Sequence, residues 1–264
     1  MAQPSRRFTP TYWVNHLTTF EACPQKYFLK HVRKRKGRIV AAAEMTRGRI
    51  THEVLAQAFK VFAGRRSFPA DLRGEIEARV TPESELARVD RVREIDMIHD
   101  WVDAAVESFD PRKSVHVVER SYGFSFRGKG AELPFIVKAK VDLLVRVDAV
   151  EIEHIDWKTG RRHPADELQA VVARIAVGSA LDEARVRSTT TYLSSRESDS
   201  RYLTRDEARP IVGRIRSIAR EIDENHVSGE WAPIQSRQCE RCQYYQHGCI
   251  LFARSGADPM KDDP

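Results

Sequence analysis

Two aspartates sit within apolar runs of one short segment, and they constrain the fold more than any other feature. The segment from Phe135 to Gly160 contains two apolar runs, joined by a short polar turn at Asp148 and Ala149. Asp142 lies inside the first run, and Asp156 ends the second. The β-branched residues and the short connection predict a hairpin of adjacent strands. Such a hairpin would bring the two acids close together.

A carboxylate that is surrounded by apolar side chains needs a partner of opposite charge or a hydrogen-bond donor. An isolated buried charge costs several kcal/mol or more, so a carboxylate among core residues must be paired or bind a cation. Asp156 and Lys158 point to the same face of a strand, because side chains alternate with period two. Two converging carboxylates form a hard oxygen site suited to Mg²⁺ or Mn²⁺. Such a metal can activate water for attack on phosphorus, which indicates phosphodiester hydrolysis.

A purely structural interpretation of the same residues is also open. Asp156 and Lys158 could form an ion pair at the end of a strand, while Asp142 caps a turn. A D-x-K triplet is common by chance, so the spacing alone favours the catalytic interpretation only slightly.

The order of predicted elements indicates an α/β or α+β domain with a mixed sheet flanked by helices. We expect one domain over residues 1–264, with a helical part at 11–63, a core sheet at 115–193, a C-terminal part at 204–250 and a frayed tail at 255–264. The predicted helices are two short pieces in Thr11–Val32, then Thr46–Ala63, Thr81–Phe109, Asp166–Leu181 and Pro210–His226. The predicted strands are Val115–Arg127, the hairpin, and Ser188–Leu193 as the last strand.

The charge balance favours a polyanionic partner. The chain has 264 residues and a net charge of +6. A basic run at Arg33, Lys34 and Arg35 is as consistent with a solvated face as with a phosphate-binding patch. No apolar run reaches the roughly 18 residues that span a bilayer, and the first residues lack a signal peptide's apolar core. We therefore expect a cytoplasmic protein without a membrane segment, whose cysteines stay reduced and free to bind metal.

The four cysteines form an unusual pattern. Cys239, Cys242 and Cys249 cluster near the C-terminus, whereas Cys23 lies far upstream. Together they could make one four-thiolate site, for a structural zinc or a 4Fe-4S cluster. A zinc ribbon normally pairs two C-x2-C motifs, and Cys23 has no such neighbour, so iron and sulfur are favoured. The alternative is that the cysteines are unused. A real site would join the two ends of the chain.

Taken together, these motifs resemble a known family. Cys23-Pro24 followed by aromatic residues, GRITHEVL at 48–55, KVDLL around Asp142, IDWKTG around Asp156 and the C-terminal cysteines occur in one order. That order resembles the RecB-like branch of the PD-(D/E)xK nucleases, and within it the iron-sulfur group that includes the CRISPR-associated four-cysteine exonucleases. The resemblance covers most of the chain, from Cys23 to Cys249.

The resemblance implies roles for individual residues. His52, which alone would be assigned a structural role, becomes a metal ligand. The fold would be a restriction-endonuclease-like core with an iron-sulfur-stapled helical region. Mg²⁺ or Mn²⁺ would be held by His52, Asp142, Asp156 and the backbone carbonyl of Trp157. Lys158 and Gln169 would assist catalysis. A 4Fe-4S cluster would be held by Cys23, Cys239, Cys242 and Cys249. The chain departs from the family pattern at Ala173, where tyrosine is usual, and at Ala139, where glycine is usual.

The expected function is a metal-dependent DNA exonuclease that prefers single strands or free ends, in DNA repair, recombination or CRISPR adaptation and defence. The residues expected to contact the DNA backbone are Arg33, Lys34, Arg35, Arg161 and Arg162. A rival interpretation is a DNA-binding subunit without turnover, working with a helicase or integrase. Ala173 supports the rival, whereas the joint presence of His52, Asp142, Asp156 and Lys158 opposes it. A third interpretation is a zinc-stapled structural protein.

Overall fold

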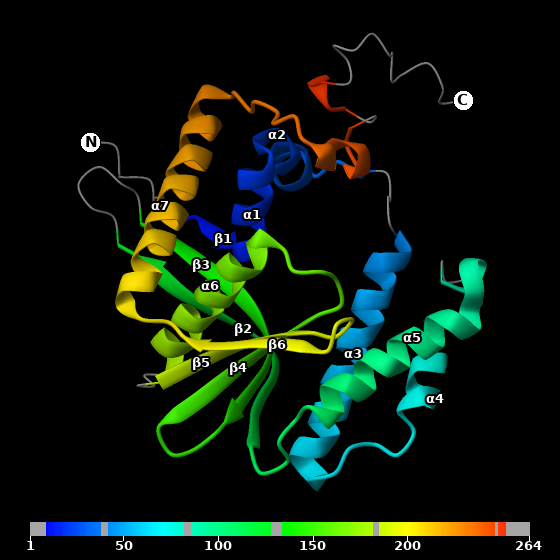
Figure 1. The fold of residues 1–264 in the computed structure, drawn as a ribbon. Coiled ribbons are helices and arrows are strands. Elements are labelled where there is room, and N and C mark those ends of the chain that lie inside the picture. Colours follow the sequence, from blue (N-terminus) through cyan, green and yellow to red (C-terminus); the bar gives the residue numbers. More distant parts are fainter. Residues whose placement is uncertain are drawn as a thin grey trace, which may run out of the picture.

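A six-stranded mixed sheet separates two helical layers in the computed structural model (Figure 1). The structure describes residues 9–37, 42–81, 86–127, 134–181, 185–245 and 248–251. Its strands are β1 (Thr11–Trp13), β2 (Ser114–Phe126), β3 (Phe135–Arg146), β4 (Glu151–Lys158), β5 (Arg185–Tyr192) and β6 (Glu197–Tyr202). Its α-helices are α1 (Val14–Ala22), α2 (Pro24–Tyr27), α3 (Ala42–Arg65), α4 (Leu72–Glu77), α5 (Ala87–Glu107), α6 (Pro164–Leu181) and α7 (Arg205–Ser228). A π-helical turn at Phe28–Val32 continues α2, and a 3₁₀ turn spans Arg237–Arg241.

The sheet combines an antiparallel meander with a parallel crossover. Strands β2, β3 and β4 pair antiparallel in sequence order. Helix α6 then carries the chain to β5, which pairs parallel with β4, and β6 returns antiparallel along β5. Because parallel neighbours need a long connection, α6 is obliged to cross one face of the sheet. This arrangement confirms the predicted mixed sheet flanked by helices.

One edge of strand β3 pairs with two different strands, β4 and β1. Leu143 to Arg146 pair with β4, whereas Ile136 to Lys138 pair in parallel with the short strand β1. The stretch from Ala139 to Asp142 pairs with neither of these two strands. Strand β4 leaves β3 after Ile155 but stays paired with β5 as far as Lys158. The sheet therefore opens into a fork at Asp142.

Two hydrophobic cores form on opposite faces of the sheet. The first lies under α1, α6 and α7, and includes Val141, Ile152, Val172 and Ile215. The second lies under α3 and α5, and includes Phe59, Leu143 and Trp157. Figure 1 shows α6 and α7 on one side of the strands, and α3, α4 and α5 on the other.

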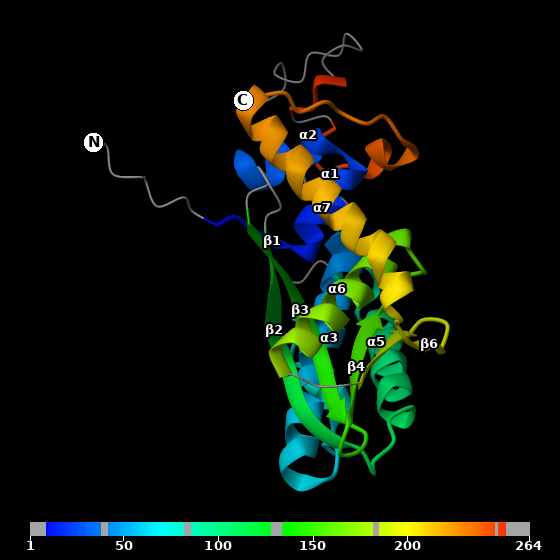
Figure 2. The same cartoon turned by 90° about the vertical axis from the view of Figure 1, so that its left-hand side faces the viewer.

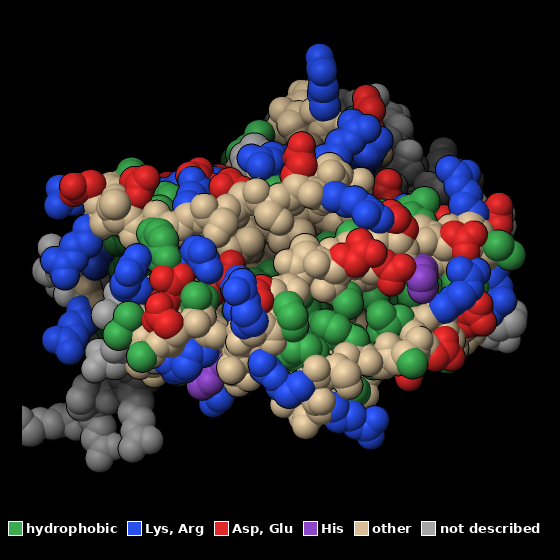
Figure 3. Space-filling model, turned by 60° about the horizontal axis from the view of Figure 1, so that its bottom comes forward, with side chains coloured by type: hydrophobic (Ala, Val, Ile, Leu, Met, Phe, Trp, Pro, Cys, Tyr) green, Lys and Arg blue, Asp and Glu red, His purple; other side chains and the backbone are tan. Residues whose placement is uncertain are grey.

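The second core is open at one place. A pocket of about 180 Å³ is lined by aromatic side chains that include Phe59 and Phe109, and by polar ones that include Lys113 and Glu153. On the face seen in Figure 3, hydrophobic side chains gather in a hollow between charged residues.

Several predicted helices are confirmed. Two helical pieces meet at Cys23, where Pro24 opens α2 as expected for a first-turn proline. Helix α3 covers the predicted Thr46–Ala63, and α7 buries its isoleucine face, including Ile211 and Ile222. The predicted start of the long helix at 81–85 lies mostly outside the described residues, and the described helix α5 begins at Ala87.

Other details differ from the prediction. The helical spacing of apolar residues in α5 predicts that Val92 is buried in one stripe with Leu86 and Ile95, but Val92 is 63% exposed. The helix changes direction at Asp90, whose φ of −162° and ψ of 95° are not helical, so the stripe does not run straight through. The hairpin connection spans four residues, 147–150, because the side chain of Asp148 accepts the amides of Val150 and Glu151 and thereby closes a longer turn.

The prediction that β5 is the last strand was wrong. Strand β6 follows it after a tight turn. Its sequence, Glu-Ser-Asp-Ser-Arg-Tyr, is polar and largely exposed, as an edge strand can be, and it lacks the apolar alternation that marks a strand. Among the described residues, no helix is both long and apolar enough to cross a membrane.

Candidate active site

The fork of the sheet brings Asp142 and Asp156 together. Leu143 faces Ile155 across the hairpin, so the register, continued by one residue, sets Asp142 opposite Asp156. Asp142 Oδ2 accepts the backbone N–H of Trp157 at 3.1 Å, a bond possible because β4 has stopped pairing with β3 there. Asp142 is only 7% exposed. The convergence that the hairpin predicted is therefore present.

A change of face in the β2–β3 ribbon accompanies the fork. Glu119 of β2 has a left-handed backbone with φ of 50°. Before it, Val118 packs against the second core; after it, Tyr122 belongs to the first core. On β3, Val141 belongs to the first core and Leu143 to the second, so both strands change faces beside Asp142. No sequence signal marks this irregularity, since glutamate rarely adopts positive φ.

Lys158 lies between an acid and an amide. Its Nζ is 2.8 Å from Asp156 Oδ2 and donates to Gln169 Oε1 of α6 at 2.6 Å. Asp156 and Lys158 share one face of β4, as the period-two argument predicted. Gln169 of α6 thus fixes the ammonium group of Lys158, and it lies beside Asp156 and Lys158 as predicted.

Helix α3 supplies His52 from the second layer. Its Nδ1 lies 3.4 Å from Asp142 Oδ2. Two contacts fix the helix against the sheet. Phe59 packs on Trp157 with ring centroids 5.1 Å apart. One turn before His52, a Cβ on Gly48 would come within 3.1 Å of Thr159 Oγ1, so the absence of a side chain lets α3 approach the loop after β4.

The four polar side chains form two charge pairs. Burial alone would lower the pKa of His52, but its contact with Asp142 outweighs burial and raises that pKa. Burial alone would raise the pKa of Asp142, yet the neighbouring His52 and the Trp157 amide hold it below its usual value. Burial raises the pKa of Asp156, and the negative charge of Asp142 raises it further. The neighbouring Lys158 lowers this pKa but does not outweigh the two. The pKa of Lys158 is raised by Asp156 despite burial.

This electrostatic arrangement suits a bound cation. Two close carboxylates, one of them with a raised pKa, gain stability when a positive charge lies between them. Asp142, Asp156 and His52 are the side chains that could hold it, and the carbonyl of Trp157 lies on the same strand. Within the described part of the chain, however, no three His, Cys, Asp or Glu side chains already form a metal-binding group. A metal would have to displace the contacts that now pair these residues.

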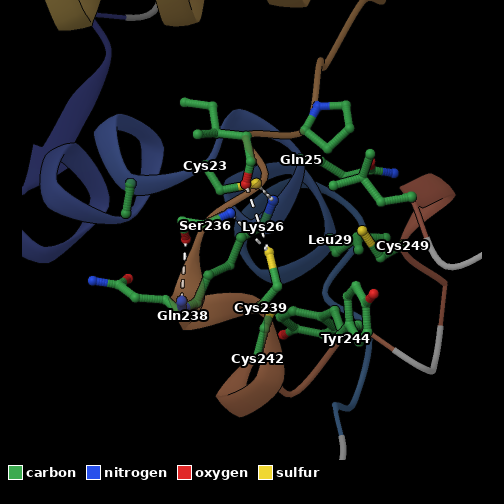
Figure 4. Close-up of a pocket in the computed structure, with 15 residues that line it drawn as sticks. Cys23, Gln25, Lys26, Leu29, Ser236, Gln238, Cys239, Cys242, Tyr244 and Cys249 are labelled. Carbon is green, nitrogen blue, oxygen red and sulfur yellow. Dashed lines mark hydrogen bonds between the residues drawn. The ribbon is translucent and has the colours of Figure 1, made fainter.

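The four cysteines line one pocket at the other end of the molecule (Figure 4). Cys23 comes from the junction of α1 and α2, where its Sγ accepts the amide of Lys26. The other three come from the C-terminal segment, and Cys239 Sγ accepts the amide of Ser236. None of the four forms a disulfide, so all four sulfurs remain available as ligands.

The predicted basic residues fall in two places, and all five side chains are exposed. Arg33, Lys34 and Arg35 follow the π-helical turn, and the Arg35 carbonyl accepts Tyr244 O–H from the cysteine-bearing segment. Arg161 and Arg162 lie in the loop between β4 and α6, where Arg162 is 3.8 Å from Asp199 of β6. Ala173, where the family pattern has tyrosine, is buried in the first core.

Sequence reasoning missed one group of polar side chains beside the acids. Ser188, Thr190 and Tyr192 occupy alternate positions of β5 and line a pocket next to β4. Their period-two spacing in a predicted strand was the available signal.

The family of this chain follows from comparison with known proteins. The model of the PD-(D/E)XK nuclease superfamily matches residues 14–247. The chain belongs to the PD-(D/E)XK nuclease superfamily. PD-(D/E)XK enzymes generally use divalent metals, and they are hydrolytic nucleases.

Solved structures show the same fold. A candidate exonuclease from Eubacterium rectale is similar at 12% identity and a TM-score of 0.54, over 97% of this chain and 100% of that one. The structure of SSO0001 is similar at 13% identity and a TM-score of 0.45, over 94% of this chain and 89% of that one. No curated protein sequence matches the chain. At such low identity, the likeness to the Eubacterium rectale structure concerns the fold alone.

Proposed function

We propose that this PD-(D/E)XK protein is a metal-dependent DNA exonuclease acting on single strands or free ends. The observation that carries the proposal is the convergence of Asp142, Asp156 and Lys158 at the fork of the sheet. A binding protein without turnover would have little need of them.

In this proposal, Asp142, Asp156, His52 and the Trp157 carbonyl hold Mg²⁺ or Mn²⁺. The metal would supply Lewis-acid stabilisation of the phosphate and an acidified water. Lys158, fixed by Gln169, positions the attacking water and offsets negative charge as the P–O bond breaks. The burial of Asp142 and Asp156 strengthens these electrostatic effects, because the local dielectric is low.

The test uses an end-labelled single-stranded oligonucleotide with Mn²⁺. We expect wild-type protein to shorten the strand stepwise and Asp156→Asn to be at least a hundredfold slower, since the carboxylate oxygen would be lost without a change of shape. Strand binding measured in EDTA should persist in the variant. Intact DNA with both proteins, despite normal binding, would support the rival function of a DNA-binding subunit working with a helicase or integrase.

We also propose that Cys23, Cys239, Cys242 and Cys249 hold a 4Fe-4S cluster. The support is that these four thiols, from both ends of the chain, line one pocket. Protein purified without oxygen should be brown, with a broad absorbance band near 400 nm and about four iron atoms per chain. Cys23→Ser should lose most of that iron. A colourless protein containing one zinc would instead identify a structural zinc site.

The basic side chains suggest how DNA would be held. Arg33, Lys34, Arg35, Arg161 and Arg162 have exposed side chains that would contact phosphates. Because such contacts release counterions, affinity for single strands should fall steeply between about 50 and 200 mM salt.

A further inference from the structure

A second pocket adjoins the acid cluster on the side of α6. It encloses about 420 Å³ between α6, β5 and β6. Its floor is formed by Ala170, Ser188, Thr190 and Tyr192, all of them buried. Its rim is formed by exposed charged residues. A pocket of this size has room for one nucleotide-sized group.

The pocket begins one strand away from the proposed metal site. Thr190 pairs with Asp156, and Tyr192 pairs with Lys158, in the parallel register of β4 and β5. Paired residues on neighbouring strands point to the same face and lie about 5 Å apart. A nucleotide whose phosphate lies at Asp156 can therefore reach the pocket with its base.

The rim favours a neutral ligand. Arg162 lies 3.8 Å from Asp199, and Arg201 lies 3.6 Å from Glu167, so each arginine has an acid beside it. A phosphate in the pocket would meet those acids and Asp166, which accepts Tyr192 O–H. A nucleobase carries no charge and offers both donors and acceptors, which matches this mixed lining.

The floor offers specific contacts to such a group. The hydroxyl of Thr190 has no hydrogen-bond partner among the described residues, although the residue is only 7% exposed. Ser188, by contrast, already contacts His154 Nδ1 at 3.0 Å. Arg162 lies over the Tyr192 ring, with its guanidinium carbon 5.1 Å from the ring centroid, so the guanidinium plane, backed by the ring, is the flat surface on which a base can stack. A hydroxyl that lines a pocket without a protein partner can donate a hydrogen bond to a bound ligand or accept one from it.

We propose that this pocket binds the nucleobase of the nucleotide adjacent to the scissile phosphate. The inference rests on the proposed nuclease function. It makes Thr190 and Tyr192 base-binding residues and explains how a strand can be positioned without a tyrosine at Ala173. The pocket selects for an unpaired base, since a base within a duplex would be stacked and out of reach.

The test compares labelled single strands that carry either a normal base or an abasic residue at one internal position, with Mn²⁺. Wild-type protein should pause at the abasic residue, with cleavage there roughly tenfold or more slower, because base contacts of this kind are lost. Ala170→Leu, which fills the pocket, should slow cleavage of the normal strand and abolish the discrimination. Ala63→Leu, at an exposed position of α3, is the matched control and should behave like wild type.

Two further measurements separate the possible outcomes. Thr190→Val removes only the hydroxyl and should weaken the discrimination severalfold. In EDTA, a strand containing 2-aminopurine should change fluorescence on binding to wild type but not to Ala170→Leu, whether or not the protein cleaves DNA. Equal cleavage of normal and abasic strands, or a rate that depends on a terminal phosphate instead, would overturn the pocket assignment. Absence of any cleavage with a retained fluorescence change would overturn only the nuclease function.

Discussion

At the scale of single residues, Lys158 offers the sharpest test of the site. Its ammonium group contacts Asp156 and Gln169 and is largely buried. Lys158→Met should lower the cleavage rate by about 10²–10⁴-fold, because a positioned proton donor or acceptor contributes about that much. Strand binding in EDTA should stay within severalfold of wild type. Single-turnover cleavage assays with Mn²⁺ measure the rate, and binding titrations in EDTA measure the affinity.

Lys140→Met is the matched control, since Lys140 lies on the neighbouring strand and its side chain is 55% exposed. It should cleave at nearly the wild-type rate. Lys158→Arg should not restore activity, because a planar guanidinium does not fit the space of a compact ammonium. Full activity in Lys158→Met would remove this residue from the mechanism.

The position of a single residue could be predicted where the residue belongs to a strand with a regular alternation of side chains. Asp142, Asp156 and Lys158 converge as predicted, because alternation along strands fixes which side chains share a face. His52 was recognised only through the resemblance, since a lone histidine on a helix carries no such rule. Glu119 and Thr190 were not recognised: a positive φ leaves no mark in a glutamate, and a strand threonine is usually structural.

At the scale of elements, a buried glutamate, Glu153, forms ion pairs on the face of β4 opposite Asp156 and Lys158. Glu153 accepts Lys113 Nζ at 2.6 Å and Thr189 Oγ1 at 2.5 Å, and it lies 3.2 Å from Arg187. Burial alone would raise the pKa of Glu153, but these partners hold it below its usual value. A depressed folded-state pKa contributes stability above the unfolded-state value, near 4.5, and that contribution is lost as the pH falls through the folded-state pKa.

Glu153→Gln should therefore lower the free energy of unfolding by about 2–4 kcal/mol at pH 7, since Lys113 and Arg187 lose their charged partner. The difference from wild type should shrink as the pH falls below about 4.5. Urea unfolding at several pH values measures it. Glu197→Gln, on the exposed strand β6, should change stability by less than about 0.5 kcal/mol. A pH-independent difference for Glu153→Gln would contradict the assigned ionisation.

Element prediction succeeded where burial patterns were strong and failed at the edges. The hairpin and the helices α3, α6 and α7 have apolar faces that only one packing arrangement buries. Strands β1 and β6 lie at the sheet's edges, so their sequences are short or polar, and only pairing with a distant strand defines them. Such pairing is a tertiary effect that a local pattern does not contain.

At the scale of the whole molecule, the two ends of the chain are packed together. Figures 1 and 2 both show α1 and α2 beside α7 and the C-terminal segment. Tyr12 O–H donates to Asp223 of α7 at 2.8 Å, and Arg214 of α7 pairs with Glu21. The two ends of the chain are therefore joined by protein contacts, and the proposed cluster would add to them.

Trp231 is the centre of this packing, so the last prediction concerns it. Its ring stacks on Tyr27 and Phe28, with centroids 5.7 and 5.2 Å apart, and it is buried. Trp231→Ala should lower the free energy of unfolding by about 3–5 kcal/mol, as removal of a buried tryptophan side chain does. It should also loosen the segment that carries Cys239 and Cys242, and so speed trypsin cleavage after Arg237 and Arg241, whose side chains are exposed.

Limited digestion followed by mass spectrometry measures the cleavage rate at these two arginines, with Trp231→Phe as the conservative control. Cleavage at the wild-type rate would mean that the C-terminal segment is held by its own contacts, such as Tyr244 with Arg35, and not by the stacked rings.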